Sequence, residues 1–271
     1  MPAGLQRRRS GDEPMILRRV IAHFRKQEWT AIFLDFLIVV VGVFVGLQVS
    51  NWNADRAEQR RADALFQRLI LDLQSELENL RTTTAYYQTT AAYARAAMLG
   101  FENPGEVDDE TFVIGAYQAS QIYELASSRS TFDEMIATGA VSLIRNPEAR
   151  ELLIGYYELN WTQTATNTLW PAYREHIRGV MPYNIQEAVK MSCGDQSKRV
   201  GRTVLTSLPE TCDIDVPPEE IAEVAVMLRS EPGLHTDLTY QMSATDTKVA
   251  SSLVAEAQLL ELISVAEGRT E

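Results

Sequence analysis

The chain has 271 residues, of which 45% are hydrophobic and 23% are charged, and its formal net charge is −12. This composition excludes a collagen, a disordered acidic tail and a disulfide-stapled miniprotein. The acidic balance also argues against a nucleic-acid-binding protein, which normally presents a basic surface. The length is sufficient for one or two domains with a buried core.

The charge is distributed unevenly along the chain. Residues 1–29 carry seven Lys or Arg against three acids, whereas residues 51–271 carry 18 basic against 33 acidic residues. The apolar stretch Ala31–Val49 lies between the two regions and contains one acid, Asp35. A division of charge across an apolar segment is typical of a membrane boundary.

The stretch Ala31–Val49 predicts a transmembrane helix. Trp29 and Trp52 flank it, and a helix between them would be about 34–36 Å long, enough to cross a hydrocarbon core of about 30 Å. Both tryptophans would then lie at the bilayer interfaces, where aromatic residues are enriched. The alternatives are a buried helix of a soluble core and a cleaved signal peptide. The first rarely lacks a polar face over this length, and the second needs a shorter apolar run followed by small residues.

These features divide the chain into a basic tail (1–29), a transmembrane helix (30–50) and a large extramembrane domain (51–271). The arginines of the tail are hard to translocate, so we expect the N-terminus in the cytoplasm and the large domain outside it. Residues 15–29 combine apolar and basic residues at helical spacing. They form either a helix lying in the membrane interface or a basic tail without defined structure.

Inside the predicted span, Asp35, Gly42 and Gly46 lie within about 40° of one line along an ideal helix. Glycines allow a second helix to approach closely, and an intramembrane carboxylate usually faces a partner. These three residues therefore predict an interface with a second copy or with another membrane protein. The alternative is that Asp35 reaches headgroup water and that the two glycines match the small-xxx-small pattern by chance.

Cys193 and Cys212 are the two cysteines of the chain. In an oxidising compartment they can pair and close a loop of roughly 20 residues, which is worth about 3 kcal/mol in the chain-entropy model. The alternative is two free buried thiols in a cytoplasmic domain. A metal site is not expected, because no histidine lies close to either cysteine in the sequence.

The sequence predicts an all-α fold, in which the transmembrane helix continues into an extramembrane helical bundle. Residues 51–99 contain neither Gly nor Pro and carry apolar residues every three or four positions, so one long helix is expected there. The run Thr82-Thr83-Thr84 lowers helix propensity and is the place where this helix would bend or loosen.

Local signals predict the shorter elements. Asn146 followed by Pro147 indicates a helix start, because Asn caps well and Pro fits the first turn. Thr131 and Glu134 have the spacing of a capping box, and Gly139 is expected to end that helix in a left-handed conformation. We expect further helices over residues 109–125, 217–229 and 236–267, and a long loop that contains both cysteines over residues 192–217.

The sequence contains no H-E-x-x-H, G-x-S-x-G, Walker A or G-x-G-x-x-G string. Its three histidines, His23, His176 and His235, are far apart, and His176 is interpreted as a packing or surface residue. We therefore assign no catalytic, cofactor-binding or metal-ligating residue and expect no enzyme activity.

Two segments carry a family resemblance. The first, VVGVFVGLQVSNWNADR, contains a Q-x-x-N-W-N-x-x-R string formed by Gln48, Asn51, Trp52, Asn53 and Arg56. The second, STFDEMIATGAVSLIRNPEARELLIGYY, contains the pattern T-[YF]-x-E-[ML]-x-x-[ST]-G-x-x-x-L-I, formed by Thr131, Phe132, Glu134, Met135, Thr138, Gly139, Leu143 and Ile144. Both resemble a group of uncharacterised bacterial single-pass inner-membrane proteins. The resemblance implies an inner-membrane protein with a large periplasmic domain, and it implies no reaction.

Together these features predict a non-enzymatic single-pass membrane protein that serves a membrane assembly as a structural or accessory subunit, or as an oligomeric scaffold. The expected partners are the lipid bilayer and either a second copy or another membrane protein, without nucleic acid, cofactor or metal. The alternative is a periplasmic ligand-binding domain of the sensor type that signals through a partner.

Overall fold

A computed structural model of the chain describes residues 29–123, 128–159, 172–201 and 203–268. The chain divides into two units, Met1–Arg60 and Arg61–Glu271, and each is described by itself. The expected interfacial helix of the basic tail falls almost entirely outside the described residues and stays a prediction.

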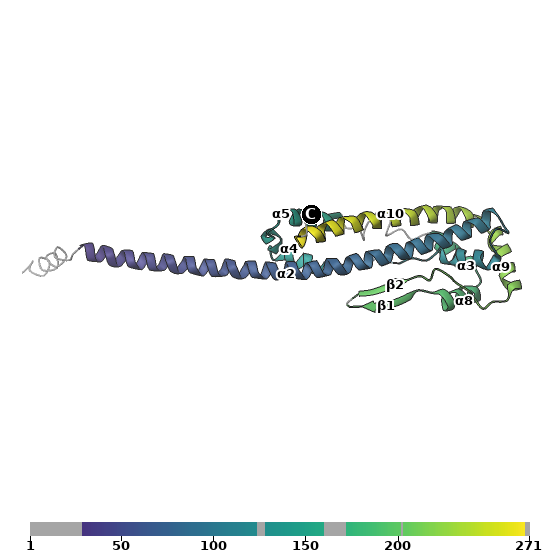
Figure 1. Cartoon of the computed structure of the whole chain (residues 1–271), viewed down its shortest axis with the longest axis horizontal. Helices are drawn as coiled ribbons and strands as arrows, with labels where there is room; N and C mark the ends of the chain where they lie inside the picture. The colour runs from purple at the N-terminus through teal and green to yellow at the C-terminus, as the bar shows by residue number, and fades with distance from the viewer. Residues whose placement is uncertain (1–28, 124–127, 160–171, 202, 269–271) are drawn as a thin grey trace, which may run out of the picture. The chain divides into compact units, whose positions relative to one another are not determined.

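Helix α2 spans Trp29–Glu102 and contributes to both units (Figure 1). The long helix predicted over residues 51–99 is therefore confirmed. It continues through Thr82, Thr83 and Thr84, whose hydroxyls donate to the backbone carbonyls four residues earlier in the helix. These bonds satisfy the hydroxyls without breaking the helical backbone pattern.

The second unit is mostly helical, as predicted, with one small two-stranded sheet. Short helices follow α2, and a long final helix returns along the unit. The elements are α3 (Asp109–Gln118), α4 (Ser130–Ala137), the 3-10 helix η1 (Ala140–Leu143), α5 (Pro147–Leu159), α7 (Ala172–Val180), α8 (Tyr183–Cys193), β1 (Gln196–Val200), β2 (Thr203–Ser207), α9 (Pro218–Ser230) and α10 (Leu234–Ala266).

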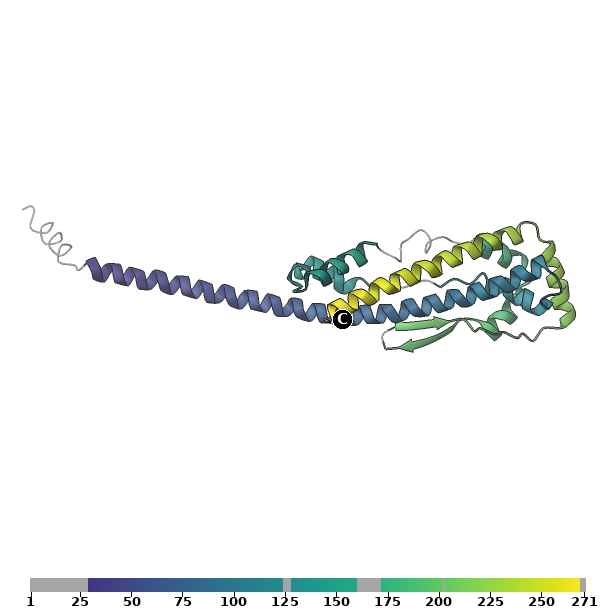
Figure 2. The same ribbon diagram turned by 45° about the horizontal axis from the view of Figure 1, so that its top comes forward.

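Helix α10 lies antiparallel beside the part of α2 that belongs to the second unit, as both ribbon views show (Figure 1, Figure 2). Residues that come later in α2 pair with residues that come earlier in α10. The paired side chains are Gln74 with Glu267, Arg81 with Glu256, and Tyr87 with Lys248.

Two large apolar clusters form the core of the second unit. One gathers side chains of α3, α7, α8 and α9 with the start of α10, and Phe112, Ile177, Ile185 and Leu228 are fully buried in it. The other joins α2 to α4, α5 and the end of α10, around side chains such as Leu69, Leu73, Met135, Leu153 and Leu259. A small third cluster contains Tyr86, Tyr87 and Leu208.

The loop predicted over residues 192–217 is wrong in part, because it contains a β-hairpin. Strand β1 pairs antiparallel with β2 from Gln196–Ser207 to Val200–Thr203. Every residue of β1 except the half-buried Val200 is exposed. The strand therefore lacks the apolar alternation by which a sequence reveals a half-buried strand. Gly201, with φ +57°, was the available turn signal.

Two helix signals around residue 140 behave as predicted. Gly139 adopts φ +72° directly after the C-cap of α4. The side chain of Asn146 accepts hydrogen bonds from the backbone amides of Glu148 and Ala149 at the start of α5. Glycine adopts the left-handed conformation without strain, and the asparagine side chain accepts hydrogen bonds from the free amides of the first helical turn.

Two other predictions are corrected. Helix α3 ends at Gln118, several residues before the expected end, because the next residues turn and Ser120 and Gln121 bind Arg178 of α7. The proposed capping box is absent, since α4 has Arg129 at its N-cap and no side chain caps it.

Candidate functional site

The apolar part of α2 in the first unit is the first candidate site. Sixteen large apolar side chains between Trp29 and Trp52 are exposed, including Trp29 at 73% and Trp52 at 59%. By length and composition α2 is one of two described helices that could cross a membrane. The other is α10, whose apolar window is partly buried inside the second unit.

The structure places Asp35, Gly42 and Gly46 on this exposed part of α2. A Cβ atom built on either glycine would meet no atom within 4 Å, so nothing in the described chain occupies the space beside them. At its other end, the guanidinium of Arg56 lies 5.1 Å from the ring centroid of Trp52. We call Asp35, Gly42 and Gly46 the small-residue stripe.

Cys193 and Cys212 lie at disulfide distance, with their Cα atoms 5.5 Å apart. The separation falls in the range that disulfides require. The pair joins the end of α8 to the segment after β2, so it closes the chain around the hairpin. The side-chain amide of Gln118 also donates to the carbonyl of Cys193, at 2.7 Å, which ties the same point to the end of α3.

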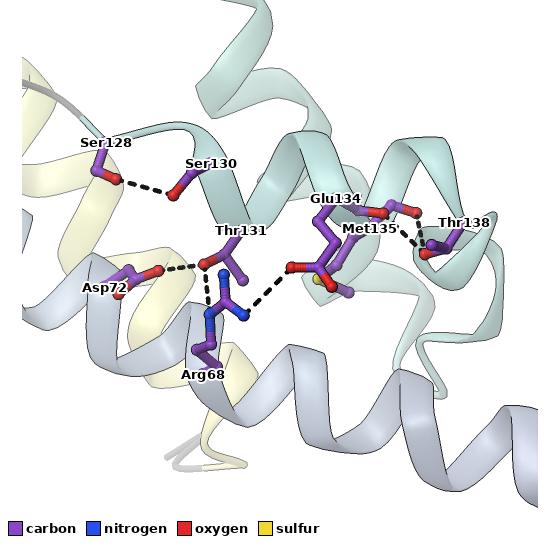
Figure 3. A network of polar contacts seen from close by, with 8 residues as sticks. All are labelled: Arg68, Asp72, Ser128, Ser130, Thr131, Glu134, Met135 and Thr138. Carbon is purple, nitrogen blue, oxygen red and sulfur yellow. Dashed lines mark hydrogen bonds and ion pairs between the residues drawn. The ribbon is translucent and has the colours of Figure 1, made fainter.

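The segment Ser130–Tyr157 contains α4, η1 and most of α5, and α4 packs on α2 through a polar network (Figure 3). The buried hydroxyl of Thr131 donates to Asp72 and accepts a bond from Nε of Arg68 at 3.0 Å. Arg68 also forms an ion pair with Glu134 at 3.2 Å. Thr131 and Glu134 therefore join α4 to α2 and do not cap their own helix.

Aromatic packing continues this junction. The rings of Phe132 and Tyr157 stack with centroids 4.2 Å apart, and Arg129 lies over both rings. The buried hydroxyl of Tyr156 donates to Glu76 of α2 at 2.7 Å. Burial and the nearby Glu76 carboxylate raise the pKa of Tyr156, so the phenol remains a proton donor. The geometry is that of a structural joint between α2, α4 and α5.

A second polar cluster lies between α2 and α10. The hydroxyl of Tyr87 donates to the carbonyl of Tyr123 at 2.7 Å and accepts a bond from Lys248 at 3.4 Å. Lys248 is 7% exposed, and burial lowers its pKa. No carboxylate within the described ranges forms an ion pair with it. Sequence periodicity placed this lysine on a helix but did not indicate its burial.

His176 occupies a third polar position, at the junction of α7 with the turn between α9 and α10. Its Nδ1 lies 2.7 Å from a carboxylate oxygen of Asp237, and its Nε2 lies 3.3 Å from one of Glu231. Hydrogen bonding to Asp237 raises the pKa of His176, and its half-buried position partly opposes this. The interpretation of His176 as a packing or surface residue missed both partners, because they lie 55 and 61 residues away.

A half-open cavity of about 290 Å³ lies beside the disulfide. Its walls come from α2, α3 and the segment around Cys212, and they include Tyr93, Thr111, Ile114 and Glu210. Across the described part of the chain, no group of three or more His, Cys, Asp or Glu side chains is placed to hold a metal ion.

Comparisons of the chain with models of protein families, with curated proteins and with solved structures find no match. The class of the protein is therefore described from its fold and from its exposed apolar segment alone. The chain is a mostly helical protein with an N-terminal apolar helix of membrane-spanning length that runs on into a folded helical unit.

Proposed function

We propose that the chain is a single-pass membrane protein that acts without enzymatic activity as a structural or accessory subunit, or as an oligomeric scaffold, of a membrane assembly. One observation carries this proposal. The apolar segment of α2 from Trp29 to Trp52 has no buried side chain, whereas the second unit buries its own apolar clusters.

The energetic argument is simple. Burying one large apolar side chain is worth about 1.5–3 kcal/mol. Leaving sixteen of them in water would cost more than the whole stability of a typical domain, which is about 5–15 kcal/mol. A bilayer removes this cost, and an α-helix satisfies its own backbone hydrogen bonds inside the hydrocarbon.

The proposed location is the inner membrane of a bacterium, with the N-terminus in the cytoplasm and the helical domain in the periplasm. The basic residues before Trp29 support this orientation. The cysteine pair supports it too, because disulfides persist in oxidising compartments. Relation to the uncharacterised inner-membrane group is part of the same proposal, and it rests on the two sequence segments that carry the resemblance.

The role in an assembly rests on the small-residue stripe. In a membrane, packed helices associate through close backbone contact and interhelical hydrogen bonds, which Gly42, Gly46 and Asp35 would provide. The partner is a second copy or a helix of another membrane protein. Trp29 and Trp52 would set the depth of the helix at the two interfaces.

The test is the mass and subunit composition of the full-length protein extracted gently from its native membrane. Replacing Gly42 and Gly46 together by Ile should reduce the mass of the complex, because the larger side chains keep the helices apart. Val40→Phe with Val41→Phe is the matched control, since these residues lie off the stripe, and it should leave the mass unchanged. A complex of unchanged size in the Gly42→Ile, Gly46→Ile variant would contradict the proposed interface.

The ligand-binding alternative has one observation in its favour, the cavity of about 290 Å³ beside Cys212. Its volume is close to the lower end of ligand pockets. Thermal-shift measurements with a panel of metabolites test it. Thr111 lines the cavity, so Thr111→Ala should alter the thermal shift that a bound ligand produces. A panel that produces no shift would count against a sensor.

A further inference from the structure

The side chain of His176 lies between two carboxylates, one on each side of the turn that joins α9 to α10. Asp237 lies in the first turn of α10, and Glu231 is the C-cap residue of α9. Each imidazole nitrogen faces one carboxylate oxygen, at 2.7 Å for Asp237 and 3.3 Å for Glu231. The one histidine therefore connects α7 to both sides of the α9–α10 turn.

The number of protons decides whether both contacts can exist together. A carboxylate can only accept a hydrogen bond, and a neutral imidazole has one N–H donor. Protonated His176 has two donors and satisfies both carboxylates. When it is neutral, the shorter contact keeps the proton on Nδ1 for Asp237, and the lone pair of Nε2 then faces the negative charge of Glu231.

The other charged groups on the helices around His176 contact other residues or are exposed. On α7, Arg174 and Arg178 bind Ser120, and Glu175 is exposed. On α3, which also packs against α7, Tyr117 lies under Arg178.

Around the turn, Arg229 of α9 pairs with Asp109. His235 of α10 faces Glu102, at 4.0 Å. Asp237 and Glu231 are therefore the two charges that respond to the proton on His176.

We propose that protonation of His176 controls how firmly α7 holds the turn between α9 and α10. This inference is independent of the proposed membrane role, because it concerns the second unit alone. The turn is able to respond, since Gly233 adopts φ +84° and α10 has no side-chain cap. Its backbone bond from Leu234 to Glu231 is long, at 3.4 Å.

The direction of the pH response follows from linkage. Hydrogen bonding to Asp237 raises the folded-state pKa of His176 above its usual value of 6.5. A raised pKa means that the contribution to stability is complete below pH 6.5 and is lost as the pH rises through the folded-state value. Protonated His176 therefore stabilises the α9–α10 turn at low pH, and this stabilisation is lost at high pH.

Hydrogen exchange of the full-length protein in lipid nanodiscs tests the proposal. The amides of Leu234 and Asp237 report on the turn, because both donate to carbonyls within it. After correction for intrinsic exchange rates, their protection should fall roughly tenfold between pH 5.5 and pH 8.5, as expected for loss of a hydrogen bond to a charged group. Wild-type protection that does not change with pH would overturn the proposal.

Variants separate His176 from other titrating groups. His176→Gln should remove the pH response. His235→Gln is the control, because His235 is an exposed histidine on α10, and it should keep the response. If His176→Gln does not fold, Glu231→Gln answers the same question, because it removes the carboxylate that deprotonation would expose. A response of undiminished size in Glu231→Gln, or one that disappears in His235→Gln, would overturn the role of His176. A smaller response in Glu231→Gln is expected, because the hydrogen bond to Asp237 still raises the pKa of His176 in that variant.

Discussion

The hydroxyl of Thr131 on α4 donates a hydrogen bond to the carboxylate of Asp72 on α2, across 59 residues of sequence. Thr131 is 1% exposed and also accepts a bond from Arg68, so this one hydroxyl links two charged side chains of α2 to α4. The spacing of Thr131 and Glu134 predicts a capping box, but no side chain caps α4.

We predict that Thr131→Val destabilises the folded protein by about 1–3 kcal/mol, because it leaves part of a charged network without its hydroxyl partner. The shape of the side chain hardly changes, so the loss measures hydrogen bonding. Chemical denaturation gives the free energy of unfolding. Thr138→Val is the control, since Thr138 is exposed and donates to backbone of its own helix. If both variants lost the same free energy of unfolding, the contacts of Thr131 with Asp72 and Arg68 would not be what stabilises the protein.

Gly115 marks a close approach of α3 to α2. A Cβ atom at this position would lie 2.9 Å from the backbone carbonyl oxygen of Tyr93. Gly115→Ala should therefore force the two backbones apart and cost about 1–3 kcal/mol, as overpacking does. Gly179 lies on α7, and a Cβ atom at this position would meet no atom within 4 Å. Gly179→Ala should therefore be neutral or stabilise the protein by up to about 1 kcal/mol. Thermal unfolding of both variants would show the difference.

Gly139 ends α4 in the left-handed conformation, at φ +72°. Gly139→Ala should cost about 1–2 kcal/mol, because a Cβ atom strains this conformation even though no neighbour blocks it. Gly155, in the middle of α5, has no atom within 4 Å of a built Cβ and no positive φ. Gly155→Ala should be stabilising by a comparable or smaller amount. If Gly155→Ala were less stable than Gly139→Ala, the positive φ of Gly139 would not explain the need for glycine at that position.

The cysteine pair predicts a stability difference between oxidised and reduced protein. Reduction of Cys193–Cys212 should lower the free energy of unfolding by about 3 kcal/mol, because the unfolded chain regains the freedom of the loop. Unfolding measured with and without reductant tests this in the wild type. The double variant Cys193→Ser, Cys212→Ser should not respond to reductant. If reductant did not change the free energy of unfolding of the wild type either, the two cysteines would not be paired.

The helices that were predicted correctly have strong local signals. Asn146 caps α5 and Gly139 follows α4 because their backbone requirements involve a few neighbouring residues. The long helix α2 was also predictable, since nothing between residues 51 and 99 interrupts a helix. The small-residue stripe, likewise, is a matter of helical spacing, and its proposed partner awaits the membrane experiment.

Features decided by distant residues were not predictable in the same way. The exposed strand β1 lacks an apolar pattern and depends on pairing with β2. The early end of α3 depends on Arg178, and the partners of His176 lie on elements that only folding brings together. In each case the deciding contact joins residues that no local pattern relates.

The sequence by itself determined the mostly helical character of this protein, the long helix α2, the local helix signals at Gly139 and Asn146, and the apolar segment between Trp29 and Trp52. Periodicity and capping operate over one or two turns, and they do not need a partner. The tertiary structure decided which polar side chains meet. Thr131 binds Asp72, Lys248 is buried against Tyr87, and His176 bridges two carboxylates. Those contacts follow from burial and packing of whole helices, whose geometry appears only when the chain is folded.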